Sequence, residues 1–465
     1  MSTTASGTQQ PAGPVLRGRV WNVGTLTYTT AGLVALFSWL LWGDFAWQMR
    51  DRSVPPVIQL LLKSFHASDT LTALLLASLP PALSMLISPI IGYKSDRYRS
   101  RWGRRIPFLL IPTPVIVLSM LGLAFSPRIG SLLDHYLGIH SPGPTISVLV
   151  VIGVFWTCFE IACITANSVF GGLINDVVPQ EVIGRFFGLF RALSLLAGII
   201  FNYWIIGKAE THYAEIFLGV AVLYGFGFSL MCFKVKEGRY PPPPMAEIAE
   251  DAPHGFLPAA RTYFRECFGK PYYLWFFAMM AVAGLANGPV NVFSVFYAQS
   301  INMSIGDYGK CLAITYIISL ILAYPVGILT DRFHPIVVSM ILLGLYCPLA
   351  LWAGFFAKDT VTFSVAFVLH GVLTGAYFTA AASMGQRLLP RSRFTELMSA
   401  NGIVCSLSSV LIAPCIGLIL DCTGHVYRHT FFAGAAFALL AVAVTFVTYT
   451  KFLALGGPKN YTAPE

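Results

Sequence analysis

The chain alternates long apolar runs with short polar segments from end to end. A run of about 20 mostly apolar residues is long enough to cross a bilayer as a helix. We expect twelve such spans: Leu26–Met49, Thr70–Ile91, Ile106–Phe125, Ile146–Phe170, Phe186–Ile206, Ile216–Phe233, Tyr272–Gln299, Tyr308–Thr330, Pro335–Phe356, Thr362–Met384, Leu397–Leu420 and Thr430–Leu453. The pattern therefore predicts an all-α membrane protein with twelve transmembrane helices.

The spacing of the runs divides the chain into two bundles of six helices. We expect an N-terminal tail at residues 1–25, a bundle at 26–233, a linker loop at 234–271, a second bundle at 272–453 and a tail at 454–465. The linker contains Pro241–Pro244, which favours an extended segment. Most Lys and Arg residues fall on the side of the termini, so both termini are expected to be cytoplasmic.

A short sequence repeats at the same place in each half. The second run ends in Pro89–Arg97 and the eighth in Pro325–Arg332, and both contain the pattern G-x-x-[S/T]-D-R. Two six-helix halves related by an internal repeat are typical of transporters, and their substrate site lies between the halves near the midplane. The repeat therefore predicts a central site between the bundles.

Composition excludes several classes of protein. Hydrophobic residues make up 56% of the chain and charged residues 11%, against about 25% charged in soluble domains. The net charge is +9, but the basic residues lie in short loops, so we expect no nucleic-acid partner. No histidine box, cluster of metal ligands or G-x-S-x-G elbow is present, so we expect no enzyme, no metal and no cofactor.

The loop after the second run contains residues suited to a conformational latch. Gly92 permits close helix contact, and Asp96 can sit at the positive end of a neighbouring helix. Arg97, Arg104 and Arg105 can bind helix carbonyls or lipid phosphates. The predicted latch comprises Gly92, Asp96, Arg97, Gly103, Arg104, Arg105, Asp176, Asp331 and Arg332. The alternative is a basic loop that only sets membrane orientation.

Charges within the runs are few, and an intramembrane charge is usually functional. Glu160 lies in the middle of the fourth run, where a carboxyl could exchange protons. Asp44 lies toward the predicted outer end of the first run and is either a coupling or an interfacial residue. Arg191 could pair with Glu160, bind a sugar hydroxyl or extend to the membrane surface.

The loop G-x-x-S-D-R followed by G-R-R-x-P-F resembles the signature of the major facilitator superfamily. It is similar to that of the sucrose/proton symporters and the wider glycoside–pentoside–hexuronide:cation symporters. The resemblance implies that Glu160, at a fixed interval before Asp176, is the proton carrier, and that protons rather than sodium are the coupling ion. Two positions depart from the sucrose symporters: Gly171 replaces an arginine, and Lys310 is followed by Cys311 rather than an acid.

Polar and aromatic residues within the runs are candidates for binding a sugar. Asn287 and Asn291 are four apart and share a helix face, as do His370 and Tyr377, seven apart. The full set is Asn167, Arg191, Asn287, Asn291, Tyr316, His370, Tyr377 and Trp156. The alternative for each is a hydrogen bond that joins neighbouring helices.

Together these features predict a monomeric, proton-coupled symporter of a sugar or glycoside that works by alternating access. We expect it in the cell membrane, or in the inner membrane of a Gram-negative bacterium, with a small solute and the bilayer as its partners. Two alternatives stay open: an exporter of another small molecule such as a drug, peptide or pigment, and a non-transporting assembly factor on the same fold.

Overall fold

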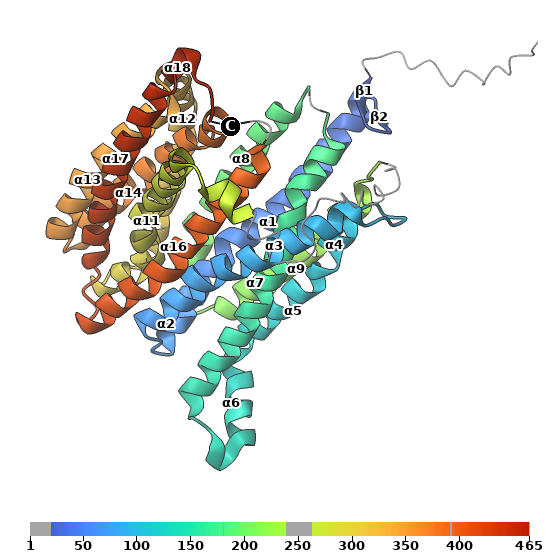
Figure 1. Cartoon of the computed structure of the whole chain (residues 1–465). Helices are drawn as coiled ribbons and strands as arrows, with labels where there is room; N and C mark the ends of the chain where they lie inside the picture. Colours follow the sequence, from blue (N-terminus) through green and yellow to red (C-terminus); the bar gives the residue numbers. More distant parts are fainter. Residues whose placement is uncertain (1–19, 180, 239–262, 391–392, 465) are drawn as a thin grey trace, which may run out of the picture.

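The computed structural model describes residues 20–179, 181–238, 263–390 and 393–464. Twelve of the described helices are long and apolar enough to cross a membrane, which confirms the predicted number of spans. Two groups of helices lie side by side, one from each half of the chain (Figure 1). The chain is therefore a multi-pass membrane protein built from two bundles.

The first half begins with a hairpin of β1 (Trp21–Val23) and β2 (Leu26–Tyr28). Its helices are α1 (Thr30–Ser64), α2 (Asp69–Ala73), the π-helical η1 (Leu74–Ser78), α3 (Leu79–Arg97), α4 (Ile106–Leu110), α5 (Pro112–Ala124), α6 (Ser126–Leu137), η2 (Gly138–His140), α7 (Pro144–Val177), α8 (Ile183–Ile200), η3 (Phe201–Ile205), η4 (Ile206–Lys208) and α9 (Tyr213–Lys234).

The second half contains α11 (Pro271–Ser300), α12 (Ile305–Phe333), α13 (Pro335–Phe356), α14 (Thr360–Ala381), α15 (Met384–Leu388), α16 (Phe394–Cys422), α17 (His429–Ala454) and α18 (Gly457–Asn460). The proline run and most of the expected linker lie outside the described residues. The hairpin of β1 and β2 and the C-terminal segment lie at the same end of the molecule (Figure 1), which we call the termini end; α2 and α6 lie at the opposite, far end.

The first span differs most from its prediction. Residues 26–28 form a strand, so the span does not begin at Leu26, and α1 continues through Pro55 and Pro56 to Ser64. Arg50, Asp51 and Arg52 therefore lie inside the helix rather than in an outer loop. Asp44 lies near the middle of α1 and is fully buried, so the predicted position near its outer end is wrong.

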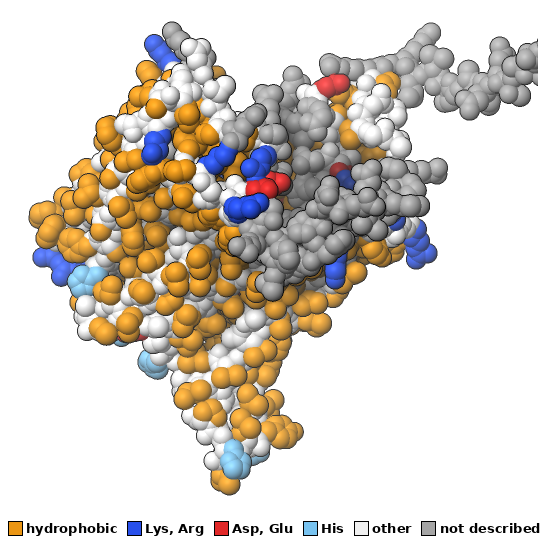
Figure 2. Space-filling view, in the orientation of Figure 1, with side chains coloured by type: hydrophobic (Ala, Val, Ile, Leu, Met, Phe, Trp, Pro, Cys, Tyr) orange, Lys and Arg blue, Asp and Glu red, His pale blue; other side chains and the backbone are white. Residues whose placement is uncertain are grey.

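The surface matches a lipid environment. Hydrophobic side chains cover most of the face in Figure 2, and most Lys and Arg side chains on that face lie toward the termini end. A helical hairpin formed by α6 and the start of α7 projects beyond the rest of the far end (Figure 1). Gly130 lies against the backbone of Val148 there, so the two helices approach each other closely.

The two halves contact each other closely at the far end. A Cβ on Gly309 of α12 would lie 2.1 Å from the carbonyl oxygen of Asn202 in η3, so this helix contact requires glycine. Gly207 and Gly306 also meet through their backbones. Because no side chains separate these helices, the far end is closed in this conformation.

Substituting Gly309 with Val is expected to force the halves apart at this contact. Overpacking of this kind typically costs about 1–3 kcal/mol, so the midpoint of thermal unfolding in detergent should fall. Gly327→Val on the same helix is the matched control, because a Cβ there has no neighbour within 4 Å. Equal midpoints for the two variants would contradict the importance of the Gly309 contact.

Candidate functional site

A central cavity of about 490 Å³ lies between the two halves. This volume is within the usual range for small-molecule sites, about 300–1,000 Å³. Its polar lining is Asp51, Arg52, Gln59, Arg191, Asn291, Ser294, Tyr308, Thr315, Tyr316, Ser319, His370 and Thr374. These residues come from α1, α8, α11, α12 and α14, so both halves contribute to the wall.

A smaller pocket of about 110 Å³ adjoins the central cavity and shares Asp51 and Pro55 with it. Arg50, Glu160, Cys163 and Asn167 also line this side pocket. The side pocket lies within the first half, between α1 and α7. Glu160 is thus separated from the central cavity by one helix, α1.

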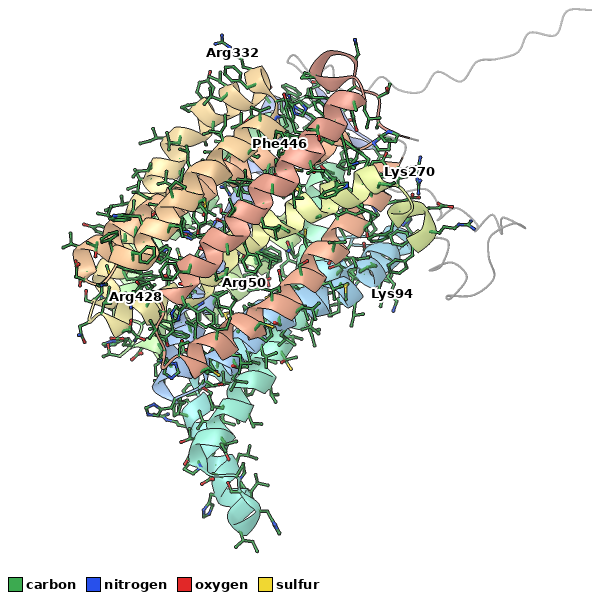
Figure 3. The ribbon with its side chains drawn as sticks, turned by 60° about the vertical axis from the view of Figure 1, so that its left-hand side comes forward. Arg50, Lys94, Lys270, Arg332, Arg428 and Phe446 are labelled. Atoms are coloured by element: carbon green, nitrogen blue, oxygen red, sulfur yellow. The ribbon has the colours of Figure 1, made fainter. Side chains whose placement is uncertain are left out.

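Arg50 occupies the interior of the molecule, as Figure 3 shows, away from Lys270 and Arg428 near opposite ends. Only 1% of its side chain is exposed, and its guanidinium stacks on Trp47 at 4.1 Å. Its Nη2 donates to Asp51 Oδ1 at 2.8 Å, but Nε and Nη1 have no hydrogen-bond partner among the residues that the structure describes. Arg50 also attracts Glu160 electrostatically. The sequence interpretation missed this buried cation.

Hydrogen bonds link Asp44 to the central cavity. Gln48 Nε2 donates to Asp44 Oδ1 at 3.1 Å, and Ser194 Oγ donates to Gln48 Oε1 at 2.8 Å. Arg52 completes the chain, because its Nη2 donates to Ser194 at 3.1 Å and its Nη1 donates to the Tyr316 hydroxyl at 3.3 Å. These hydrogen bonds connect Asp44 to Arg52 in the cavity wall. Asp44 does not line the side pocket that contains Glu160.

The cavity brings together only some of the predicted sugar-binding residues. Arg191, Asn291, Tyr316 and His370 line it, and His370 Nε2 lies 3.1 Å from Asn291 Oδ1. Asn287 does not line the cavity, but its Oδ1 accepts a hydrogen bond at 2.8 Å from Thr374, which does. Asn167 lies in the side pocket instead.

Trp156 and Tyr377, also predicted to bind sugar, do not face the cavity either. Trp156 is buried, stacks on Phe159 and donates its Nε1 to the Leu75 carbonyl at 2.7 Å. Tyr377 is buried in an apolar cluster with Tyr273 and Phe276. Tyr377 shares a helix face with His370 but does not reach the cavity, because seven residues of helix rise about 10 Å along its axis.

The predicted latch residues of the first half form a network at the termini end. Arg104 binds Asp176 through Nε at 3.0 Å and Nη2 at 2.7 Å, and Arg105 Nε reaches the same carboxylate at 3.2 Å. Arg105 Nη1 also donates to Ser95 at 2.8 Å. In this conformation these bonds join α3, the start of α4 and α7 within the first half.

Glu237, which the sequence interpretation missed, completes this network. Its carboxylate accepts from the backbone nitrogens of Arg104, Arg105 and Ile106 at 2.7–2.9 Å, at the start of α4. Gly103 has φ +105, and a Cβ there would collide with Glu237.

Gly92 faces open space, so the predicted close contact is absent at that residue. The side chains of Asp96 and Arg97 lie outside the described part of the structure.

The repeat in the second half makes weaker contacts. Asp331 pairs with Arg387 at the surface, and Arg332 is exposed with its guanidinium beside the ring of Phe333.

Lys310 has an acidic partner after all, because Asp307 pairs with it at 2.8 Å one turn earlier. The acid is therefore displaced in sequence rather than missing.

Asp176→Asn is expected to weaken the first half at the termini end. Hydrogen bonds to charged groups each contribute about 1.5–3 kcal/mol, and Asp176 is 15% exposed. Asp331→Asn is the matched control, because Asp331 is 77% exposed and exposed pairs contribute at most about 1 kcal/mol. Thermal unfolding of both variants in detergent should show the larger loss for Asp176→Asn; a larger loss for Asp331→Asn would contradict this ranking.

A polar cluster closes the far end. It comprises Lys63 and Asp69 from the first half and Asp421, His425 and Tyr427 from the second. Tyr427 accepts from Lys63 at 2.9 Å and donates to Asp69 at 3.1 Å. Asp421 accepts from the backbone nitrogens of Asp69 and Thr70, so a carboxylate of one half caps a helix of the other.

Asp69, Asp421 and His425 have ligand atoms within 4.8 Å of one another. This spacing would suit a metal ion, but the carboxylate oxygens already bind Tyr427, His425 and the start of α2. Hydrogen bonds between the halves run from the cavity to the far end. The cluster therefore acts as an interdomain contact.

Comparison with known proteins decides the family. A model of the family described as MFS/sugar transport protein matches residues 62–389, well over half of the chain. The chain belongs to the MFS/sugar transport protein family. The resemblance read from the loop after the second span is thereby confirmed.

Relatives of this chain include solute carrier family 45 member 4 of Mus musculus, 28% identical over 209 residues. That match covers 43% of this chain and 25% of the mouse protein. A sucrose transport protein of Arabidopsis thaliana is 30% identical over 117 residues, covering 24% of this chain and 19% of the plant protein. These matches span at most a quarter of either relative's length.

Solved structures share the fold over nearly the whole chain. An inward-facing bacterial homolog of the human lysosomal transporter Spinster has a TM-score of 0.65 and 15% identity, covering 93% of this chain and 98% of its own. A D-xylose–proton symporter has a TM-score of 0.64 and 13% identity, covering 89% and 96%. The chain therefore has the major facilitator fold with twelve candidate membrane spans.

Proposed function

We propose that the chain is a secondary active transporter that moves a sugar or glycoside together with protons by alternating access. The observation that supports this most directly is the position of Glu160. This carboxyl is half-buried in the middle of α7, beside the guanidinium of Arg50 and one helix away from the central cavity. Membership of a sugar transport family supports the solute class.

Coupling follows from the electrostatics of this pair. An ionised Glu160 attracts Arg50, whose Nε and Nη1 form no hydrogen bond with the described residues. A proton on Glu160 removes that attraction and leaves Arg50 paired with Asp51 in the cavity wall. The proton-loaded and proton-free carriers thus present different charges to the solute, which is the requirement for linked binding.

The proposal also includes orientation and location. With both termini cytoplasmic, the closed far end faces outward and the structure corresponds to an inward-facing carrier in the cell membrane. The excess of Lys and Arg near the termini end supports this orientation. A monomer suffices, because both halves of the cavity come from one chain.

Sugar-driven proton uptake into proteoliposomes tests the function. A pH dye outside the vesicles should report alkalinisation when a transported mono- or disaccharide is added, and a protonophore should abolish the signal. Protein-free vesicles are the control. Silence across a sugar panel, with protein that is shown to be folded, would contradict the proposal and favour an exporter or an assembly factor.

A further inference from the structure

The side pocket contains a buried cation with unused hydrogen-bond donors. Arg50 is 1% exposed and lies in the interior of the molecule (Figure 3). Its guanidinium lies 4.1 Å from the ring centre of Trp47 and 5.0 Å from that of Tyr224, so aromatic rings surround it. Nη2 donates to Asp51, whereas Nε and Nη1 donate to no described residue. A buried donor without a protein partner indicates that a water or an ion binds there.

The charge around Arg50 depends on the proton of Glu160. The ionisable groups that face Arg50 are Asp51 of α1, Glu160 and Cys163 of α7, and Tyr224 of α9. When Glu160 is ionised, two carboxylates share one cation and repel each other. When Glu160 is protonated, Asp51 is the one carboxylate left among the described residues that line the side pocket.

Asp51 cannot satisfy Arg50 by itself. Its side chain is 58% exposed, it uses Oδ1 to accept from Nη2 of Arg50, and it also lines the central cavity with Arg52 and Arg191. Asp44 lines neither of the two pockets. Because uncompensated charge within a membrane protein is costly, the proton-loaded carrier has a place for one more negative charge beside Arg50.

The dimensions of the side pocket limit what can occupy it. Its volume is about 110 Å³, whereas one water takes up about 30 Å³ in the liquid and small-molecule sites measure about 300–1,000 Å³. A monatomic anion with a few waters fits, and a sugar does not. Such an ion can enter from the central cavity, because Asp51 and Pro55 line both spaces. Asn167 also lines the side pocket and offers an amide donor.

We propose that the side pocket binds a chloride ion at Nε and Nη1 of Arg50 when Glu160 carries its proton. The ion takes the place of the ionised carboxylate, so Arg50 keeps a second anionic partner in both protonation states. This inference rests on the proposed function for the proton on Glu160, and it adds an inorganic anion that is distinct from the solute. Because chloride and ionised Glu160 compete for one cation, proton binding and chloride binding strengthen each other.

Chloride titration of the unaltered protein in detergent tests the inference. Gluconate replaces chloride at constant ionic strength, and the midpoint of thermal unfolding is recorded at each pH. We expect a saturable rise with chloride, because an ion that binds the folded state stabilises it and gluconate is too large for the pocket. The apparent Kd for chloride should increase with pH, by up to about tenfold per pH unit, since one proton is linked to binding.

Two neutral variants of glutamate residues test the link to Glu160. Glu160→Gln cannot ionise, so it should bind chloride at every pH with the affinity that the unaltered protein reaches in acid. Glu215→Gln, on an exposed side chain of α9, should keep the pH dependence of the unaltered protein. A Glu160→Gln protein whose chloride affinity still falls with pH would overturn the inference.

Arginine variants locate the ion. Arg50→Met should lose the saturable rise, measured as the difference between chloride and gluconate within that variant because its stability is lower in both. Arg52→Gln and Arg191→Gln alter the central cavity and should retain the rise. Loss of the rise in these two variants, with Arg50→Met unaffected, would place the ion in the central cavity and overturn the inference.

Transport in the two media separates this inference from the proposed function. Sugar-driven proton uptake in proteoliposomes should be faster with chloride on both sides than with gluconate. Equal rates, together with equal unfolding midpoints in the two media, would overturn the chloride site and leave the proposed function intact. Absence of sugar-driven proton uptake in both media, with pH-linked chloride binding retained, would overturn the proposed function and leave the chloride site intact.

Discussion

Replacing Glu160 with Gln is expected to abolish accumulation of the solute against its gradient. Gln keeps the size and polarity of the side chain but cannot exchange a proton, so the carrier loses the group that links its charge to pH. Exchange of labelled for unlabelled solute at equal concentrations should persist, because that reaction needs no proton release. The measurements are concentrative uptake and equilibrium exchange in the same proteoliposomes.

Glu215→Gln is the matched control for this experiment. Glu215 is exposed in the first turn of α9, away from the side pocket, and its substitution should leave both reactions unchanged. If the Glu160→Gln protein still accumulates solute with the wild-type dependence on the proton gradient, then Glu160 is not the proton carrier. Asp44, which is fully buried and bound to Gln48, would become the next candidate.

Arg50→Met is expected to reduce both stability and coupling. The change retains an apolar stem against Trp47 but leaves Asp51 and Glu160 without their shared cation. Removing one partner of a buried ion pair typically costs about 3–5 kcal/mol. Because Asp51 is 58% exposed to the cavity, we expect a value at the lower end, about 3 kcal/mol. Thermal unfolding in detergent and concentrative uptake are the two measurements.

A double variant separates the two effects. Arg50→Met with Asp51→Asn removes the stranded carboxylate, so stability should recover in part while coupling stays lost. Arg128→Met, on an exposed side chain of α6, is the control for loss of a positive charge and should change neither property. Wild-type coupling in the Arg50→Met protein would show that Glu160 acts without its neighbouring cation.

The number of spans could be predicted because lipid contact imposes a local pattern of about 20 apolar residues. The course of α1 could not, because Arg50–Arg52 and Pro55–Pro56 are individually typical of a loop or a helix end. What keeps this segment helical and buried is packing by Trp47 and Tyr224, and Tyr224 comes from α9. Such tertiary contacts leave no signal in the local sequence.

The candidate site was predictable to a similar degree. Glu160 stands out because it interrupts an apolar run, and Asp176 because it follows at the family interval. Glu237 could not be found, because its partners lie more than 130 residues earlier in the chain. The Trp156 side chain points toward η1 because η1 and α3 pack against α7. A helical wheel of α7 alone gives no information about this packing.

The two prolines of α1 determine where this helix is softest. A proline has no N–H, so the carbonyls of Asp51 and Arg52, four residues before Pro55 and Pro56, lack their usual helical partners. The residues that bind Arg50 and line the cavity thus lie at the least rigid turn of a 35-residue rod. Beyond that turn the rod continues to Lys63, which is fixed to Tyr427 of the other half. We therefore expect α1 to bend at the charged site, while its C-terminal end stays attached to the polar cluster at the far end.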